Sequence, residues 1–387
     1  MAEIPTHGDV EPRIPPRRGR PVTQADVARY ASVSTAVVSY VVNGGPRPVA
    51  AATRERVLGA VRLLGYRPNA SARALRMGAT KLIGVVLPEI ANPLFAEMAL
   101  SIEQYAGELG FAVLVTNSAS DPTVERRNIR NLAARQVDGM ILVTVMGPSD
   151  LVGLPIADIP TVLLNTFEET PGFASIGIDA FDGTYRGVRH LIEHGHPSVA
   201  LVIGRHSGDD VELRERGWLA ATRDAGLPDG PIAREEFSRA GGHRAGHGLF
   251  GGLNPPTAVF CSSDWQAIGV FRALYELGLR VPEDVAVVSF DGTESSEYTN
   301  PQLTVVRQPV AAMAADAISR VVEMGKPNDR PHRPDVGGAF KVAPSPGAQA
   351  DATTLTTSTH RIAHTADLII RRSCGCHPEL ASRSLQA

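Results

Sequence analysis

The sequence predicts an α+β multidomain protein, with an all-α N-terminal head and a two-lobed α/β body built on parallel sheets. Short helical patterns with start and stop signals fill residues 22–66. From residue 81, continuous apolar runs alternate with amphipathic stretches, which is typical of buried parallel strands covered by helices. The charge divides at the same place, because residues 1–80 carry a net charge of +7 and the remainder carries −10. A basic head indicates a polyanionic partner, although a solvated arginine-rich surface is the alternative.

The composition excludes several classes of protein. A length of 387 residues and a hydrophobic content of 43% predict more than one folded domain. No run of about 18 apolar residues occurs, so no membrane span is expected. The first residues lack the apolar segment of a secretory signal, and three cysteines in such a length do not make a disulfide framework. We therefore expect a cytoplasmic protein with no membrane partner.

Residues 1–21 are rich in Pro, Arg and Gly and have no hydrophobic periodicity, so we expect a disordered basic tail. The stretch RRGRP within it is similar to the core of an AT-hook, which lays arginines in a minor groove. A single copy is weak evidence, and a plain flexible tail is the favoured interpretation.

Three helices are expected in the head, over residues 24–31, 35–43 and 51–64. Thr23 is a suitable N-cap for the first, with Asp26 at the N3 position of a capping box. The Gly- and Pro-rich loop 43–48 stops the second helix, and Gly65 ends the third.

The second helix pairs an apolar side with a small polar side. Its valines would pack onto the other two helices, whereas the opposite side carries Ser34, Thr35, Ala36, Ser39 and Tyr40. In a helix-turn-helix, such a helix enters the major groove and presents its N-terminal residues to base edges. Hydroxyl groups can bond phosphates and bases there, and an alanine methyl can contact thymine. An ordinary three-helix bundle is the alternative.

Several motifs, in order along the chain, resemble the LacI/GalR family of transcriptional regulators. They are VTQADVARYASVSTAVVSYVVNG, TRERVLGAVRLLGYRPNASARALR, TKLIGVVLPEIANPLFAEM, QVDGMILV, PTAVFCSSDWQAIGV, LGLRVPEDVAVVSFDG and PQLTVVRQP. The resemblance covers roughly residues 22–325 and resumes at LIIRRSCG. It implies a helix-turn-helix head on a body of the type I periplasmic-binding-protein fold.

The resemblance also implies how the head meets DNA. Within the hinge and linker, residues 67–80, the stretch 67–75 matches the family's hinge helix, which folds on operator DNA. The leucine matching Leu75 enters the minor groove and kinks the duplex. An ordinary interdomain linker is the alternative. The family's pattern assigns DNA contacts to Thr23, Ser34, Thr35, Ala36, Ser39, Tyr40, Asn43, Arg47, Asn69, Ala72 and Leu75.

The chain departs from the family at two positions of the second helix. Many members carry Thr and Arg where this chain has Val37 and Tyr40. A tyrosine cannot make the bidentate contact that arginine makes with guanine, so the operator preference is open at that position. Arg47 in the following loop is expected to contact a phosphate.

The body is expected over residues 81–373, with three chain crossings between its lobes. We assign the near lobe to residues of about 81–180 and 308–340, and the far lobe to about 181–307 and 341–373. Residues 325–365 are expected to be mostly loop, with an insertion near 341–365 that has no assigned role. An apolar strand is expected within 366–372, and residues 374–387 are interpreted as a tail.

Motif matching predicts a pocket for a small effector between the lobes. Arg214 of RERGW and Asp291 of SFDG would bond its hydroxyl or carboxylate groups. The full predicted set is Asn92, Phe95, Asn165, Phe167, Arg214, Phe237, Asp264, Trp265 and Asp291. An aromatic ring beside an Arg/Asp pair suits a sugar, because its C–H face stacks and its hydroxyls accept charge-assisted bonds.

Structural roles remain open for several of these residues. Phe95 and Phe237 are equally consistent with core packing, and Asp264 with a helix N-cap. Arg214 and Asp291 could instead form a structural ion pair.

No catalytic or metal-binding constellation is expected. The CGCH stretch (residues 374–377) holds ligand types but has no evident second ligand pair, and a terminal tail is favoured. HRAGH places His243 and His247 four residues apart without the glutamate of a zinc protease, and HLIEHGH (residues 190–196) fits a helix end. No nucleophile elbow, Walker loop or dinucleotide fingerprint occurs, so we expect neither an enzyme nor a cofactor.

These observations predict a homodimeric repressor that binds double-stranded, near-palindromic operator DNA and responds allosterically to a small, sugar-like molecule. The alternative is a sugar-binding receptor protein without DNA function. That class predicts a signal peptide and no basic head.

Overall fold

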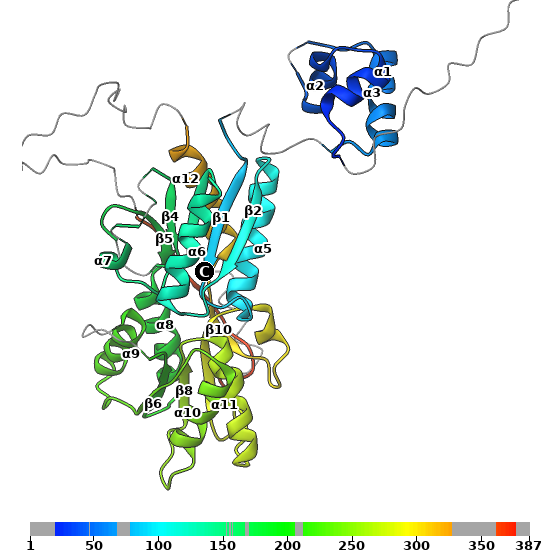
Figure 1. The fold of residues 1–387 in the computed structure, drawn as a ribbon. Coiled ribbons are helices and arrows are strands. Elements are labelled where there is room, and N and C mark those ends of the chain that lie inside the picture. Colours follow the sequence, from blue (N-terminus) through cyan, green and yellow to red (C-terminus); the bar gives the residue numbers. More distant parts are fainter. Residues whose placement is uncertain are drawn as a thin grey trace, which may run out of the picture. The chain divides into compact units, whose positions relative to one another are not determined.

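The computed structural model describes most of the chain as two units, residues 1–80 and 81–387 (Figure 1). The described residues are 20–45, 47–67, 78–151, 153–154, 156, 158–166, 170–205, 212–326 and 361–376. Most of the predicted tail 1–21, most of the predicted hinge with Asn69, Ala72 and Leu75, the insertion up to residue 360, and Phe167 lie outside them.

The head is a three-helix unit whose helices match the predicted ranges. They are α1 (Gln24–Ala31), α2 (Thr35–Asn43) and α3 (Ala51–Leu64). Thr23 and Asp26 form the predicted capping box, and Gly65 adopts a left-handed φ of 65° after α3. Val27, Val38 and Val57, one from each helix, are 0% exposed and form the centre of a common core. The valines of α2 therefore hold it against α1 and α3, as predicted.

Gly59 offers a way to stabilise this small unit. It lies inside α3, and a Cβ built on it would meet no described atom within 4 Å. Because alanine has less backbone freedom to lose than glycine, Gly59→Ala should stabilise the head by about 0.5–1 kcal/mol. Hydrogen exchange of the α3 amides in the full chain would measure this. Slower exchange in α3 with unchanged exchange in the body is expected, and faster exchange in α3 would contradict the prediction.

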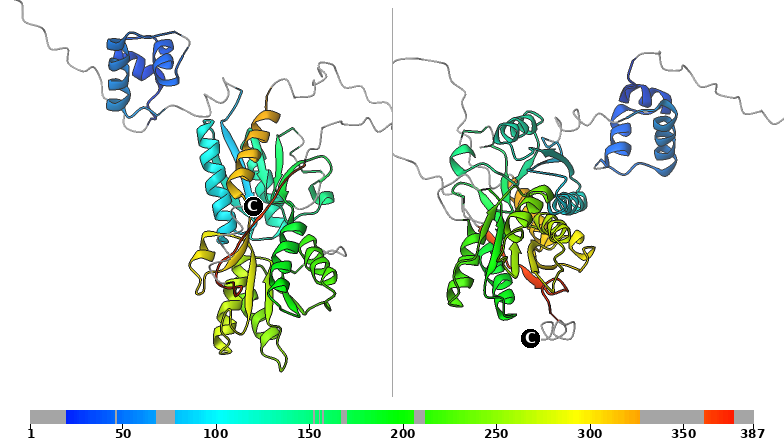
Figure 2. Two further views of the ribbon diagram at one scale, coloured as in Figure 1. Left: turned by 180° about the vertical axis from the view of Figure 1, so that it is seen from behind. Right: turned by 90° about the horizontal axis from the view of Figure 1, so that it is seen from below.

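The near lobe is a six-stranded parallel sheet with helices on both faces (Figure 1). Its strands are β1 (Leu82–Leu87), β2 (Ala112–Asn117), β3 (Gly139–Leu142), β4 (Thr161–Leu164), β5 (Ala174–Ile178) and β11 (Arg361–His364). Its helices are α5 (Pro93–Glu108), α6 (Pro122–Ala134), α7 (Pro148–Leu151) and α12 (Val310–Met324). Helices α5 and α12 lie side by side on one face, as the view from behind also shows (Figure 2).

The far lobe repeats the same topology. Its strands are β6 (Val199–Ile203), β7 (Ile232–Arg234), β8 (Ala258–Cys261), β9 (Ala286–Asp291), β10 (Thr304–Arg307) and β12 (Asp367–Ile369). Its helices are α8 (Ala180–Glu193), α9 (Leu213–Asp224), α10 (Arg239–Phe250), α11 (Asp264–Glu276) and the short 3-10 helix η1 (Glu294–Glu297). The strand orders β11-β5-β4-β3-β1-β2 and β12-β10-β9-β8-β6-β7 correspond position by position, so β4 and β9 are equivalent strands. Only β12, at the sheet edge, pairs antiparallel among the described strands.

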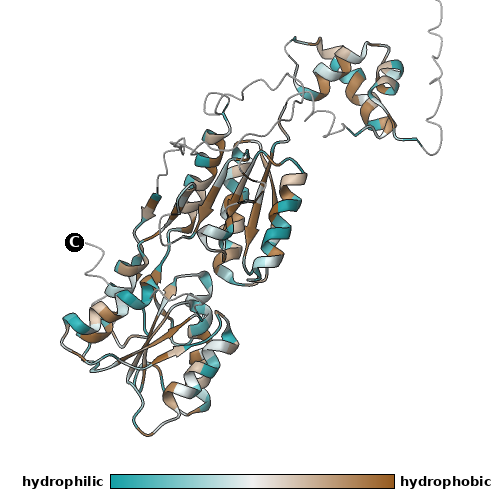
Figure 3. Ribbon diagram, turned by 60° about the vertical axis from the view of Figure 1, so that its left-hand side comes forward, coloured by the Kyte–Doolittle hydropathy of each residue, from teal (hydrophilic) through white to brown (hydrophobic). Residues whose placement is uncertain are grey.

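The apolar runs of the sequence became the inner strands of both sheets. Strands β3, β6, β8 and β9 are buried along their whole length, because helices cover both faces. In Figure 3 the strands of both lobes are coloured hydrophobic, while the surrounding helices show one hydrophobic and one hydrophilic side.

The C-terminal part of the chain differs from the prediction in two respects. Residues 361–364, assigned to a loop and the far lobe, form β11 and pair parallel with β5 in the near-lobe sheet. A short edge strand gives little hydrophobic signal, since its outer side faces solvent. Residues 374–376, assigned to the tail, belong to the far lobe: Ser373 Oγ donates to the carbonyl of Val287 at 2.6 Å, and Cys374 is 1% exposed.

Candidate DNA-binding and effector-binding sites

The start of α2 presents the predicted polar face to solvent. Ser34, Thr35 and Ala36 are exposed, while Gln24 Nε2 donates to the Thr35 carbonyl at 2.8 Å and ties α1 to α2. Ser34 also caps the helix, because its Oγ accepts from the Val37 N–H at 3.3 Å. The exposed start of α2 is therefore held rigidly by its neighbours, as a helix that reads base edges requires.

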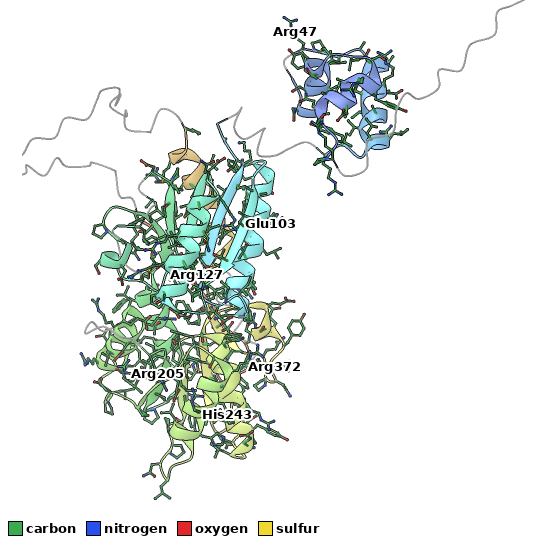
Figure 4. All side chains as sticks on the ribbon, viewed as in Figure 1. Arg47, Glu103, Arg127, Arg205, His243 and Arg372 are labelled. Atoms are coloured by element: carbon green, nitrogen blue, oxygen red, sulfur yellow. The ribbon has the colours of Figure 1, made fainter. Side chains whose placement is uncertain are left out.

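The remaining predicted DNA contacts of the head divide by their exposure. Arg47 is exposed and projects from the loop after α2 (Figure 4), and Asn43 is exposed and donates to Ser39 Oγ at 3.2 Å. Tyr40 is half-buried with its ring against Gly45, where a Cβ would come within 2.2 Å of the Tyr40 ring. The tyrosine thus shapes the loop from inside as well as reaching the surface.

The side chain of Thr23 has a structural role, because its hydrogen bonds to Asp26 form the N-terminal cap of α1. Its Oγ1 donates to Asp26 Oδ2 at 2.6 Å, and its backbone N–H donates to the same oxygen at 2.9 Å. These bonds hold the pKa of Asp26 below its usual value. The Thr23 Oγ1 also accepts from the Asp26 N–H at 3.3 Å, so a DNA contact of the Thr23 hydroxyl would have to use its one remaining lone pair.

Two carboxyl groups meet where the far-lobe strands end. Asp291 closes β9 and is 4% exposed, and Asp264 opens α11 and is 2% exposed. Asp264 is not the helix N-cap, since Ser263 fills that position. Its carboxylate accepts from Ser289 Oγ at 2.5 Å and from the N–H and Oγ1 of Thr293, each at 2.7 Å. Asp264 therefore fastens the loop after β9 to α11.

The backbone at Asp291 is strained. Its φ is 112°, a region that non-glycine residues rarely adopt. Asn165, directly after the equivalent strand β4, also has a positive φ, 59°. Such conformations concentrate at binding sites, because a rigid fold holds them there in order to aim a side chain. Each lobe thus places one amide or carboxyl side chain at the same edge of its sheet.

Burial dominates the electrostatics of this pair of acids. Loss of solvent, together with the nearby Asp264 carboxyl, raises the pKa of Asp291 well above its usual value, and burial raises the pKa of Asp264. The positive charge of Arg214 and a hydrogen bond from Gln308 Nε2 at 2.9 Å act in the opposite direction on Asp291.

Arg214 lies on the first turn of α9, 8% exposed, and connects several of these groups. Its Nη1 donates to the Ser262 carbonyl at 2.8 Å, and its Nε donates to Glu212 at 2.5 Å. The guanidinium carbon is 5.0 Å from the centre of the Phe237 ring, which is 41% exposed. A cation over a partly exposed aromatic ring is compatible with the sugar site that the sequence predicts, and the site stays a prediction.

The other predicted residues differ in how free they are to meet a ligand. Asn92 is the N-cap of α5 and accepts from the Leu94 N–H at 3.1 Å, and Phe95 packs against the core. By contrast, Asn165 Oδ1 and Trp265 Nε1 are buried without a hydrogen-bond partner in the described part of the chain. A buried polar atom without a partner costs about 1–3 kcal/mol, so these two groups favour a ligand nearby.

Gln308, which lies at the same edge of the far-lobe sheet as Asp291, was not among the residues predicted from the sequence. Gln308 bonds Asp291 and has an unpartnered buried Oε1 among the described residues. It also lines a cavity of about 310 Å³ together with Glu97, Gly292, Glu294, Glu297 and Arg307. None of the predicted effector residues is among the lining residues of that cavity. Two signals were available: Gln308 lies in the family motif PQLTVVRQP, and it follows the strand TVVR, at an edge where strand ends meet.

Replacing Asp291 by Asn should stabilise the body at neutral pH. An acid whose folded pKa is raised contributes most stability below its unfolded pKa of about 3.9, and that stability is lost as the pH rises towards the folded pKa. Asparagine does not titrate, so the melting temperature of Asp291→Asn should rise relative to that of the wild type as the pH increases from about 3.9 towards the folded pKa of Asp291. Each kcal/mol corresponds to about 2–4 °C.

Asp284 supplies a control of opposite sign. Hydrogen bonds from Arg280 lower the pKa of Asp284 to about 2, so its stabilisation is present above the unfolded pKa. The melting temperature of Asp284→Asn should therefore not rise relative to that of the wild type as the pH increases. An Asp291→Asn protein that melts below the wild type at every pH would contradict the prediction.

Comparison with known proteins decides the family. Residues 23–69 match the bacterial regulatory proteins of the lacI family, and residues 188–338 match the periplasmic binding protein-like domain. The HTH-type transcriptional repressor PurR of Photorhabdus laumondii is 33% identical over 306 residues, which cover 78% of this chain and 89% of that protein. The chain belongs to the LacI family. Catabolite control protein A of Priestia megaterium is 36% identical over 301 residues, 77% of this chain and 90% of that protein.

A solved structure supports the same assignment. The lac repressor dimer bound to operator and the anti-inducer ONPF superposes with a TM-score of 0.76 at 28% identity, covering 92% of this chain and 99% of that chain. This LacI-family protein is thus a DNA-binding transcriptional repressor with a periplasmic-binding-protein-like effector domain, and it is not an enzyme. Repressors of the family bind operator DNA as dimers and respond to small-molecule effectors. In the described part of the chain, no helix is both long and apolar enough to cross a membrane.

Proposed function

We propose that this LacI-family repressor binds a near-palindromic operator as a homodimer and is controlled by a sugar or sugar derivative. One observation carries the effector assignment. The Arg214 guanidinium lies over the partly exposed Phe237 ring, 5.0 Å from its centre, and its charge partly offsets the rise that burial causes in the pKa of Asp291. A sugar ring presents an apolar C–H face and a rim of hydroxyls, and this site offers an aromatic face beside charged hydrogen-bonding groups.

Two solved relatives support a sugar. The complex of transcriptional regulator CelR with cellobiose is 27% identical, with a TM-score of 0.61. A LacI family transcriptional regulator from Lactobacillus casei, solved with bound sucrose, is 26% identical with the same TM-score. In this chain, Asn165 and Trp265 would add hydrogen bonds from the near and far lobes, because their buried polar atoms lack partners among the described residues.

The DNA-binding half of the proposal rests on the head. The exposed Ser34, Thr35 and Ala36 would meet base edges, and Arg47 would meet a phosphate. The hinge residues Asn69, Ala72 and Leu75 would enter the minor groove, as the family pattern predicts. Such a protein acts on chromosomal DNA, so its place is the cytoplasm.

A homodimer would use the near lobe. Leu100 of α5 is 68% exposed and Val115 of the adjacent edge strand β2 is 38% exposed. Exposed apolar side chains on neighbouring elements are typical of an interface. A two-fold dimer presents two heads to two symmetric half-sites, and an operator of that symmetry is therefore expected.

Signalling would pass through the junction of the lobes. The chain crosses it three times, after β5, after β10 and after β11. Glu97 of α5 also accepts from the Glu294 N–H of the far lobe at 3.0 Å. An effector that prefers one arrangement of the lobes shifts the repressor towards it, and operator DNA must change the effector affinity by the same factor.

A two-step experiment tests the proposal. Genomic fragments selected by the full-length protein define the operator, and a thermal-shift screen of a sugar library identifies the effector. The expected result is a sugar that raises the melting temperature and changes operator affinity, on a site with two symmetric half-sites. Selection of no duplex over random competitor would overturn the DNA assignment. A non-sugar effector, with no sugar active, would overturn the sugar assignment.

A further inference from the structure

A cluster of two cysteines and two histidines lies in the far lobe, apart from the effector residues. His190 and His194 are four residues apart at the end of α8, and Cys374 and Cys376 belong to the segment after β12. The expectation that these cysteines have no second ligand pair is wrong, because the fold brings two histidines to Cys376 from more than 180 residues away.

Three of the four potential ligand atoms form a close group, and the fourth, Cys374 Sγ, lies beside it in contact with Cys376 Sγ. Cys376 Sγ lies 2.8 Å from His194 Nε2, 3.3 Å from His190 Nε2 and 3.3 Å from Cys374 Sγ. The ligand atoms of His190, His194 and Cys376 all lie within 4.8 Å of one another. In a tetrahedral zinc site with Zn–N of about 2.0–2.1 Å and Zn–S of about 2.3 Å, neighbouring ligand atoms stand roughly 3.3–3.8 Å apart. To admit the ion, the 2.8 Å separation of Cys376 Sγ and His194 Nε2 would have to widen by at least about 0.5 Å, and the two 3.3 Å separations by less.

A hydrogen bond orients one of the histidines for this role. His194 Nδ1 lies 2.6 Å from the backbone carbonyl oxygen of His190. A carbonyl only accepts, so Nδ1 carries the proton and Nε2 presents its lone pair to the cluster. Metal-binding histidines are typically held in this way, with the second ring nitrogen donating to a carbonyl or a carboxylate.

We propose that Cys374, Cys376, His190 and His194 form a structural Zn²⁺ site that fastens the C-terminal segment of the chain to α8. Two thiolate and two imidazole ligands leave no open position, so the site suits a structural rather than a catalytic ion. The neighbouring segment is already bonded to the sheet, since Thr304 N–H donates to Ser373 Oγ at 2.8 Å. Arg372, labelled in Figure 4, marks where this segment lies on the far lobe.

The site is separate from the effector residues. Ser373 bonds Val287, near the start of β9, whereas Asp291 ends that strand. The cluster therefore lies at the opposite end of the far-lobe sheet. Removing the metal should lower the stability of the far lobe and leave the affinity for a sugar unchanged.

A second group of potential ligands provides a matched control. His243 and His247 of α10 both contact Glu276 Oε2, at 2.7 and 2.8 Å. This group is more exposed, contains no thiol, and shares Glu276 with Arg272 at 2.6 Å. Replacing one histidine in each group shows which of the two groups holds a bound metal. His247→Ala removes a ligand from the surface group, and His194→Ala removes one from the cysteine cluster.

Elemental analysis of the tag-free, full-length protein after dialysis tests the proposal. We expect on the order of one zinc per chain in the wild type and in His247→Ala, and almost none in His194→Ala and Cys376→Ser. His194 is exposed, so its replacement should leave the fold intact. Zinc that stays in both cluster variants, or that is lost only in His247→Ala, would overturn the proposal. So would a wild-type protein without zinc, or one whose Cys374 and Cys376 are joined as a disulfide.

Cobalt substitution gives a readout of the ligands themselves. Co²⁺ bound by thiolates in a tetrahedron shows a thiolate-to-metal charge-transfer band and strong visible bands. Both should be present in the wild type and in His247→Ala and absent in Cys376→Ser. Bound cobalt without a charge-transfer band would show that no cysteine is a ligand, and the proposed site would be rejected.

Discussion

Arg214→Ala is expected to weaken binding of the sugar effector by about 10- to 150-fold, the range that corresponds to the loss of a charged hydrogen bond of about 1.5–3 kcal/mol. The side chain is 8% exposed, bonds the Ser262 carbonyl and lies over the Phe237 ring, so its replacement removes a buried positive charge from the proposed site. Operator binding by the effector-free protein should be unchanged, because Arg214 belongs to the body. Calorimetric titration of the sugar and fluorescence anisotropy of operator DNA measure the two effects.

A matched control lies two residues further along the same helix. Arg216 is exposed, so Arg216→Ala removes the same charge without reaching the buried cluster and should bind the sugar like the wild type. Because the charge of Arg214 also offsets part of the rise that burial causes in the pKa of Asp291, the circular dichroism melt of each variant should be recorded. A folded Arg214→Ala protein with wild-type sugar affinity would show that the effector binds elsewhere.

Val38→Asp should abolish specific operator binding. Val38 is 0% exposed at the centre of the three-helix core. A small domain of this size has only about 3–5 kcal/mol of stability, and an unpaired buried carboxylate costs several kcal/mol. The head should therefore unfold and lose the factor of about 10³–10⁷ that separates specific from non-specific affinity. Anisotropy titrations of operator and random duplex measure this ratio.

Val38→Asp also adds a negative charge, which by itself weakens binding to DNA. A control variant must therefore add the same charge without unfolding the head. Leu63 of α3 is 71% exposed, and Leu63→Glu adds the same charge without entering the core. It should retain most of the preference for operator, while Val38→Asp loses it. The body of Val38→Asp should still bind the sugar with unchanged affinity. If Val38→Asp kept its preference for operator, α2 would not be held by this core.

Local patterns were sufficient for the head and the inner strands. Thr23 and Asp26 lie three residues apart, and the N-cap geometry needs only those two side chains. The strands at the centre of each sheet are covered on both faces, so their continuous apolar runs identify them. Such signals arise within a single turn or a single strand, and neighbours far along the chain do not alter them.

Helix α10 shows where local patterns fail. Its sequence RAGGHRAGHGLF is rich in glycine, which disfavours a helix in isolation. The structure explains the glycines, because α10 packs tightly against α11. A Cβ on Gly242 would come within 2.0 Å of the Gln266 carbonyl oxygen, and one on Gly246 within 2.6 Å of Ala273. Close packing between the helices compensates for the poor intrinsic propensity.

Only part of the effector site could be predicted from the sequence. Motif matching named Arg214 and Asp291, but the contact of Gln308 with Asp291 and the bonds that fix Asp264 depend on loops that follow different strands. The cluster of Cys376 with His190 and His194 likewise joins segments that are distant in the sequence.

The sequence by itself determined the class of protein: a basic helix-turn-helix head, alternating strands and helices, and the order of family motifs. Only the tertiary structure decided which lobe receives residues 361–364, which side chains surround the buried acids, and which histidines meet the terminal cysteines. The physical reason is the range of the interactions. Helix caps and hydrophobic periodicity act over a few residues, whereas edge-strand pairing, pKa shifts and ligand clusters arise from groups that only folding brings together.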